Sequence, residues 1–313
     1  MGTPHNHWGF WPAFRTAGAH VHGGGGDRST VRLIAAIVVN ILLTAAQVAG
    51  GVLSGSLALI ADALHNFSDA TALVVALVAR RIALRKPDHR RTFGYGRAQI
   101  IGAMINLTSL ILIAVYLLVE AAQRFFVREP IAGWTVVIVA ALALLIDVIT
   151  AAMVYSLARG SLNIKAVFLH NLTDALASVG VILAGLLIVF FDLYVADLVA
   201  TVAIAGYILH QSFPVLKQAV TILMESVPDD VDLSELIAAV REVPGVHSIH
   251  HVHAWHLDEN RKAMEAHIVI DPLNAHDMER TKEAIKQRLV QDFDITHSTL
   301  EFEFINPQSK DQT

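Results

Sequence analysis

The residues His65-Asn66-Phe67-Ser68-Asp69-Ala70 lie inside a long apolar segment, and a near copy, His170-Asn171-Leu172-Thr173-Asp174-Ala175, lies inside another. In each copy the histidine precedes the aspartate by four residues, so the two side chains share one face of a helix. An ionisable side chain within a membrane-spanning segment is costly and by default indicates a functional site. Two imidazoles and two carboxylates together make a tetrahedral ligand set suited to zinc. The repeat therefore predicts a divalent metal ion bound by His65, Asp69, His170 and Asp174 inside a membrane.

The composition supports a membrane protein and narrows the choice of metal. Of the 313 residues, 54% are hydrophobic and 16% are charged, whereas soluble domains carry roughly 25% charged residues. The mean hydropathy is +0.53. The chain has no cysteine, which excludes disulfides and thiolate ligands and disfavours a copper(I) site. Histidine ligands also disfavour a pure magnesium or calcium site, so the expected ions are zinc, cobalt and cadmium.

Six apolar segments predict an α-helical membrane protein with six transmembrane helices. They cover residues 32–53, 57–79, 100–122, 131–157, 163–190 and 194–213. The connection between the second and third segments holds seven basic residues between positions 80 and 97. By the positive-inside rule this connection is cytoplasmic, and an even number of spans places both termini in the cytoplasm as well. No secretory signal peptide is recognisable at the N-terminus.

The predicted domain organisation has four parts. Residues 1–29 form a flexible cytoplasmic tail whose histidines are either weak metal ligands or incidental. Residues 30–213 form the transmembrane domain, 214–306 a cytoplasmic domain, and 307–313 a second tail. In the cytoplasmic part, a helix up to about 241 precedes strands at 247–257 and 263–271, a helix at 275–291 and a strand at 298–304. This order predicts a small two-layer α+β domain.

The predicted cytoplasmic domain is acidic and rich in histidine. Residues 225–306 hold 17 acidic and 7 basic residues together with eight of the sixteen histidines of the chain. The acidic balance argues against nucleic acid as a partner. Because side chains alternate along a strand, His251 and His253 are expected on one face, and His250 and His256 on the other.

Four further ionisable residues lie in or next to the apolar segments. Asp62 shares the helix face of His65 and is interpreted as a cap or an interhelical hydrogen-bond partner rather than a metal ligand. Asp147 is either a proton relay or the partner of a polar group such as Asn40, Gln47 or Asn106, with a structural use favoured. Asp197 and His210 are interpreted as structural or interfacial.

At this point several motifs together resemble the cation diffusion facilitator family, in its zinc/cobalt/cadmium efflux branch. The motifs are Ser56-Leu57-Ala58-Leu59-Ile60-Ala61-Asp62-Ala63-Leu64-His65, Arg91-Thr92-Phe93-Gly94-Tyr95-Gly96-Arg97, the His170–Asp174 pair and Pro228-Asp229-Asp230-Val231. The resemblance implies a homodimer of six-helix protomers, each with a ferredoxin-like cytoplasmic metal-binding domain. It also implies export of a divalent metal across the bacterial inner membrane in exchange for protons. Histidine at the first position of both pairs resembles the zinc-preferring branch.

The same resemblance implies metal sites outside the membrane. Asp88 and His89, in the basic connection, would hold a second metal, although a solvated loop is the favoured alternative. His250, His267 and His276, with Glu301 or Glu303, would form cytoplasmic zinc sites that brace the dimer; surface histidines without metal are the alternative. The ending Glu301-Phe302-Glu303 departs from the better-known His-x-Asp ending of the family.

Three other functions are alternatives to a proton-coupled exporter. A membrane metalloenzyme is disfavoured, because four protein ligands leave no open position for an activated water and no separate general base is apparent. A passive channel or importer is opposed only by the family resemblance. A membrane-anchored sensor is disfavoured because a segment that serves only as an anchor does not need two His/Asp pairs, and ionisable side chains inside the bilayer cost free energy. The expectation is therefore a transporter and not an enzyme.

Overall fold

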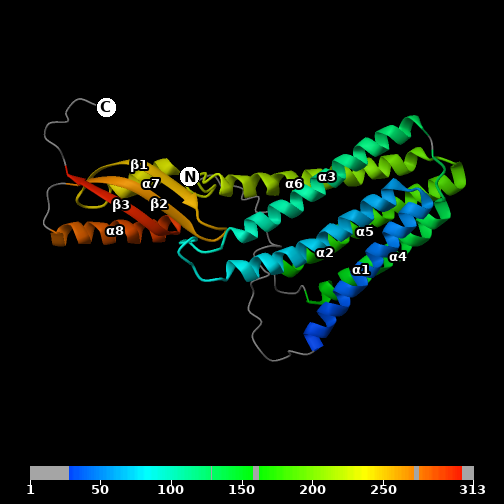
Figure 1. Ribbon diagram of the computed structural model, residues 1–313, viewed down its shortest axis with the longest axis horizontal. Helices are drawn as coiled ribbons and strands as arrows, with labels where there is room; N and C mark the ends of the chain where they lie inside the picture. The colour runs from blue at the N-terminus through cyan, green and yellow to red at the C-terminus, as the bar shows by residue number, and fades with distance from the viewer. Residues whose placement is uncertain (1–27, 128, 158–161, 271–274, 305–313) are drawn as a thin grey trace, which may run out of the picture. The chain divides into compact units, whose positions relative to one another are not determined.

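The structure is a computed structural model that describes residues 28–127, 129–157, 162–270 and 275–304 (Figure 1). Its first six elements are helices: α1 (Arg28–Ser54), α2 (Leu57–Ala83), α3 (Ala98–Phe126), α4 (Gly133–Leu157), α5 (Leu162–Phe191) and α6 (Val195–Leu223). Each of the six predicted apolar segments is therefore helical. The sixth helix, however, continues through Pro214 to Leu223, ten residues beyond the predicted end at 213. Of the two predicted tails, residues 1–27 and 307–313 lie outside the described residues, whereas residues 28 and 29, predicted as part of the first tail, belong to α1.

Four of the described helices are long and apolar enough to cross a membrane. They are α3, α4 over Gly133–Ala152, α5 over Asn171–Phe191, and α6. The part of α1 whose side chains the structure describes contains the shorter apolar stretch Ile41–Ser54. The hydropathy of α2 is lowered by the polar residues of its middle turns, including Asp62, His65 and Asp69. The helices thus support a membrane protein, whereas the number of six spans stays a prediction.

The described residues divide into two compact units. The first contains the chain up to Leu77 together with Asn106–Phe213, and the second contains Val78–Ile105 together with the chain from Pro214 onward. The basic connection between α2 and α3 thus belongs to the same unit as the C-terminal strands.

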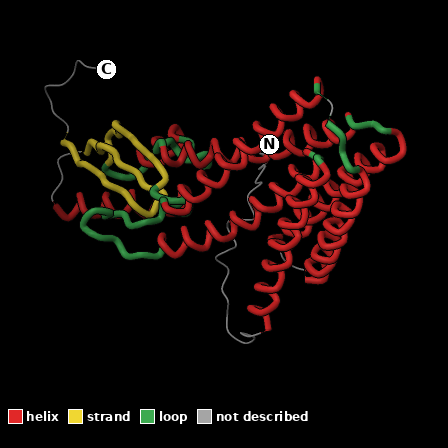
Figure 2. Tube along the Cα trace, turned by 45° about the vertical axis from the view of Figure 1, so that its right-hand side comes forward, coloured by secondary structure: helices red, strands yellow, loops and turns green. Residues whose placement is uncertain are grey.

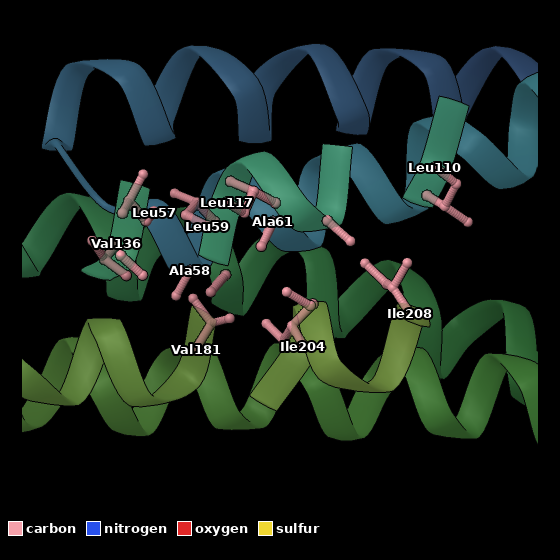
Figure 3. Close-up of a cluster of buried hydrophobic side chains, with 14 residues drawn as sticks. Leu57, Ala58, Leu59, Ala61, Leu110, Leu117, Val136, Val181, Ile204 and Ile208 are labelled. Atoms are coloured by element: carbon pink, nitrogen blue, oxygen red, sulfur yellow. The ribbon is translucent and has the colours of Figure 1, made fainter. Parts of the chain in front are cut away.

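A buried apolar cluster packs five helices of the first unit together (Figure 3). The labelled side chains come from α2 (Leu57, Ala58, Leu59 and Ala61), α3 (Leu110 and Leu117), α4 (Val136), α5 (Val181) and α6 (Ile204 and Ile208). Six of them, for example Ala58, Leu117 and Val136, have no exposed surface. Because this cluster lies one to two turns before His65 on α2, it fixes the position of the helix that carries the first half of the repeat.

The start of α2 is held by a carboxylate from another helix. Asp197, in the first turn of α6, is fully buried. Its Oδ1 accepts a hydrogen bond from the Ser56 hydroxyl at 2.5 Å, and its Oδ2 accepts one from the Leu57 amide at 2.8 Å. The first amides of a helix have no partner within the helix, so Asp197 acts as an N-cap supplied by α6. The structural role expected for Asp197 is confirmed.

The C-terminal elements of the second unit form a three-stranded sheet with two helices (Figure 2). The elements are α7 (Leu233–Arg241), β1 (Val246–His256), β2 (Lys262–Ile270), α8 (Ala275–Phe293) and β3 (Ile295–Phe304). The strand order is β1-β2-β3, with β1 and β2 antiparallel and β2 and β3 parallel. A parallel pair needs a crossover, and α8 provides it. The predicted order of helices and strands is confirmed, whereas the ferredoxin-like class stays a prediction.

Candidate metal-binding sites

Three of the four residues of the predicted intramembrane site lie together. The Nε2 atom of His65 on α2 is 3.3 Å from Oδ1 of Asp174 on α5 and 3.7 Å from Oδ2 of Asp69 on α2. One ligand atom from each of the three residues lies within 4.8 Å of the other two. The side chains of His65 and Asp174 are buried, whereas that of Asp69 is 34% exposed.

These separations suit a shared metal ion. Zinc holds nitrogen and oxygen ligands at about 2.0–2.2 Å, so two ligands of a tetrahedral ion lie roughly 3.3 Å apart. The His65–Asp174 separation of 3.3 Å has this length, and the His65–Asp69 separation of 3.7 Å is slightly longer. A movement of the Asp69 carboxylate by a few tenths of an ångström toward His65 would give the His65–Asp69 pair the same separation as the His65–Asp174 pair.

His170 lies on α5 one turn before Asp174, which puts it on the same face of that helix. Its side chain lies outside the described residues, so its place as the fourth ligand stays a prediction. The ring of Tyr207 on α6 lies edge-on to that of His65, with ring centroids 6.3 Å apart. The sequence analysis missed Tyr207, because a tyrosine near the middle of an apolar helix carries no signal of its own.

A buried chain of polar side chains begins one turn before His65. The Gln47 amide on α1 donates a hydrogen bond to Oδ2 of Asp62 at 2.6 Å, and the Asn66 amide donates to Oε1 of Gln47 at 3.2 Å. Asp62 is 1% exposed. The interpretation of Asp62 as an interhelical hydrogen-bond partner is therefore confirmed.

Asp147 on α4 faces a residue that the sequence analysis did not consider. The hydroxyl of Ser178 on α5 lies 3.3 Å from Oδ2 of Asp147. Of the three amides that the sequence suggested for Asp147, Gln47 donates to Asp62, and Asn106 lies beside the Thr71 hydroxyl. The contact between Ser178 and Asp147 could not be predicted from the sequence, because the hydroxyl of a serine in an apolar helix often donates a hydrogen bond only to the backbone of its own helix.

A second group of ligand atoms lies on the sheet of the other unit. His250 on β1 pairs with His267 on β2, and His267 pairs with Glu301 on β3. Nδ1 of His267 is 2.6 Å from Oε1 of Glu303, and Nε2 of His250 is 3.5 Å from Oε2 of the same carboxylate. His250, His267 and Glu303 each offer one ligand atom within 4.8 Å of the others. We call these three residues the sheet cluster.

An irregularity in β1 changes which histidines face this cluster. The register between β1 and β2 shifts between His250 and His253, and His251 has a positive φ of 48°. The rings of His250 and His251 both approach that of His267, with centroids 5.3 and 5.2 Å away. The expected strict alternation, with His250 and His251 on opposite faces, is therefore wrong at this point, because a bulge breaks the two-residue period. His251 is an additional candidate ligand that alternation concealed.

The other predicted ligands have mixed outcomes. Glu301 lies 3.6 Å from Nε2 of His267, at the edge of the sheet cluster. His276 lies in the first turn of α8, and its side chain lies outside the described residues. In the basic connection, Asp88 accepts hydrogen bonds from the Arg90 and Arg91 amides and from the Tyr95 hydroxyl. These bonds lower the pKa of Asp88 and make it a turn-forming carboxylate; a metal site with His89 stays a prediction.

We expect His267 to keep its proton to a higher pH than an ordinary histidine. The hydrogen bond to Glu303 raises the pKa of His267 and lowers that of Glu303, because it favours the charged form of each partner. Histidine NMR on the metal-free full-length protein should show a titration midpoint for His267 above the usual value of about 6.5. A Glu303→Gln variant should return the midpoint toward that value; an unchanged midpoint would contradict the pairing. Since metal must displace this proton, binding at the sheet cluster should weaken as the pH falls.

The sequence matches known protein families along most of its length. Residues 33–224 match the profile described as the cation efflux transmembrane domain, and residues 228–304 match the cation efflux protein cytoplasmic domain. The chain belongs to the cation efflux family. The family resemblance of the sequence motifs is thereby confirmed, and the chain is a membrane protein of a family of metal cation transporters.

Curated members of the cation efflux family align along most of the chain. The metal cation efflux system protein CzcD of Cupriavidus metallidurans is 39% identical over 285 residues, covering 91% of this chain and 89% of that protein. The zinc transporter ZitB of Pectobacterium atrosepticum is 36% identical over 291 residues, covering 91% and 89%. The cadmium, cobalt and zinc/H(+)-K(+) antiporter of Bacillus velezensis is 34% identical over 287 residues, covering 91% of each. All three are named as transport proteins and none as an enzyme.

Proposed function

We propose that this chain exports zinc across the bacterial inner membrane in exchange for protons, with cobalt and cadmium as further cargoes. The proposed transport site consists of His65, Asp69, His170 and Asp174, which would hold the metal tetrahedrally and present it to each side of the membrane in turn. The observation that carries the proposal is the meeting of His65, Asp69 and Asp174 on α2 and α5 at separations that suit a shared metal. The names of the relatives, which include zinc, cadmium and cobalt, support the choice of cargo.

Exchange with protons follows from the ligand types. Metal binding requires a neutral imidazole and ionised carboxylates, so the binding of metal releases protons and the binding of protons expels metal. Histidine is suited to this exchange because it changes its charge near cellular pH. One of the relatives is named as an H(+)-K(+) antiporter, which supports coupling to protons.

We further propose that the protein is a homodimer of six-span protomers with both termini in the cytoplasm. The match of residues 228–304 to the family's cytoplasmic domain supports this arrangement. His250, His267 and Glu303, with His251 or Glu301 beside them, would hold a resident zinc ion there. That ion would tie the three strands together, because one residue comes from each strand.

The function is tested by zinc uptake into inside-out membrane vesicles with and without an imposed pH gradient. In this orientation the cytoplasmic side faces the medium, so an exporter loads the vesicle interior. We expect uptake to require a gradient that is acidic inside and to collapse when a protonophore is added. Uptake that ignores the gradient would point to a channel or uniporter, and zinc binding without any uptake would point to a sensor. Vesicles from cells without the protein provide the background.

A further inference from the structure

The aromatic ring of Tyr207 on α6 lies beside the imidazole of His65, the residue whose Nε2 faces both candidate carboxylate ligands. The two ring centroids are 6.3 Å apart and the ring planes meet at 81°, which is an edge-to-face arrangement that aromatic pairs prefer. Tyr207 is half-buried, and the side chain of His65 is 11% exposed. A third helix thus reaches the group of ligands that α2 and α5 bring together.

The packing of α6 determines where this ring lies. Ile208, the residue after Tyr207, is 1% exposed and belongs to the buried apolar cluster (Figure 3). At the beginning of the two helices, Asp197 on α6 caps α2 at Leu57. His65 lies eight residues beyond Leu57, which is about 12 Å along α2, and Tyr207 lies ten residues beyond Asp197, about 15 Å along α6. The two helices therefore run in the same direction from one joint and meet again at these rings.

An imidazole must keep one orientation to serve as a metal ligand. The second side-chain torsion of histidine is broad and roughly two-fold, and a half-turn about it would put a carbon atom where Nε2 of His65 now lies. Gln47 on α1 holds the surrounding turn of α2, because it donates to Asp62 and accepts from Asn66. These bonds fix the helix but not the ring. Tyr207 lies beside the ring itself, so it restricts this rotation.

The restriction by Tyr207 does not depend on what the ligands have bound. The interactions of Nε2 with Asp69 and Asp174 change whenever metal or protons bind, because metal needs a neutral imidazole and ionised carboxylates. A tyrosine ring is neutral at cellular pH, and its packing is the same in each state of the ligands. The Gln211 amide, one turn further along α6, donates a hydrogen bond to the Tyr207 hydroxyl and so holds the tyrosine in turn.

We propose that Tyr207 is a positioning residue of the transport site and limits the metal to four protein ligands. Its ring keeps Nε2 of His65 directed at Asp69 and Asp174, and it occupies the α6 side of the imidazole, where water would otherwise enter as a further ligand. Tyr207 thus favours zinc, which takes four ligands, over manganese, which takes six. The inference rests on the proposed function, because it concerns the same site.

Cobalt(II) is the probe that tests this geometry, because four-coordinate cobalt absorbs visible light much more strongly than six-coordinate cobalt. Every full-length protein in the experiment carries His267→Ala, which removes the central residue of the sheet cluster. The spectrum of the intramembrane site is the difference between this protein and one that also carries Asp174→Ala. We expect an intense spectrum when Tyr207 is present. Tyr207→Leu should show a much weaker one and should bind cobalt roughly tenfold more weakly.

Two control variants make the result specific to the ring beside His65. Tyr207→Phe keeps the ring and should keep the intense spectrum. Tyr116→Leu makes the same change on α3, at a tyrosine that is 64% exposed, and should keep it as well. A role of Tyr207 in packing alone would lower the thermal stability of Tyr207→Leu without changing its spectrum. An unchanged spectrum and affinity in Tyr207→Leu would therefore overturn the proposal.

A second measurement decides if Tyr207→Leu fails to fold. Zinc should change the near-ultraviolet circular dichroism of the tyrosines in the His267→Ala protein, because the charge beside the Tyr207 ring changes. This change should be absent from Tyr207→Phe in the same background, and a change that persists there would overturn the proposal.

The outcomes separate this inference from the proposed function. If Asp174→Ala leaves the cobalt spectrum as it was, the proposed transport site itself fails. If Asp174→Ala removes the spectrum but Tyr207→Leu does not alter it, the transport site stands and only the role of Tyr207 is refuted.

Discussion

An Asp174→Ala variant of the full-length protein is expected to lose zinc uptake by about 100-fold or more in inside-out vesicles, while its amount in the membrane is unchanged. Changes to groups that merely orient a metal ligand already reduce affinity or activity by 10–100-fold, so loss of a ligand should cost at least as much. Asp174 is buried, and its carboxylate on α5 lies 3.3 Å from the imidazole of His65 on α2. Its removal would also leave the His65 imidazole without its acidic partner on α5.

A conservative variant and a matched control make this result specific. Asp174→Asn keeps the size of the side chain but loses the charge, and we expect it to transport nearly as poorly as Asp174→Ala. Asp192→Asn changes an exposed carboxylate in the connection that follows α5, where the backbone has a positive φ of 50° that asparagine tolerates well. Its uptake should equal that of wild type. Normal zinc uptake by Asp174→Ala would refute the proposed transport site. The same experiment should show losses of zinc uptake of similar size for His65→Ala, Asp69→Ala and His170→Ala.

The helical part of the fold could be predicted because a long apolar segment that crosses a membrane has few alternatives to the α-helix. Each of the six predicted segments is a helix. The spacing of the repeat was also sufficient to propose the Asp69 and Asp174 carboxylates as metal ligands. The end of α6 could not be predicted in the same way. The composition changes near residue 214, but a helix that leaves an apolar environment can continue with a polar surface, and α6 therefore runs to Leu223.

The partners of the buried polar residues could not be predicted. Ser178, Gln47 and Tyr207 have roles that depend on which helices pack together, and a single sequence does not specify that packing. The bulge at His251 is a similar case: it depends on the register against β2, which an alternating pattern assumes to be regular. Sequence patterns thus identified the ionisable residues, while the structure identifies the neutral residues that orient them.

The second large effect is expected at Asp197, the buried carboxylate that caps α2. We expect Asp197→Ala to destabilise the protein by about 2–4 kcal/mol. Loss of a cap costs roughly 0.5–2 kcal/mol, and each buried donor left without a partner costs about 1–3 kcal/mol. The Ser56 hydroxyl and the Leu57 amide would both lose their acceptor, and both are buried. Thermal unfolding of the purified protein in detergent measures the change.

The variant Asp197→Asn separates capping from charge. Asparagine keeps one carbonyl oxygen, so it can accept the hydrogen bond of either Ser56 or Leu57 but not both, and the loss of stability should be about half of that of Asp197→Ala. Because α2 carries Asp69 and His65 beyond the apolar cluster, a loosened helix start should also weaken zinc binding, although Asp197 touches no ligand. An Asp197→Ala protein as stable as wild type would show that α2 is held by its apolar packing alone.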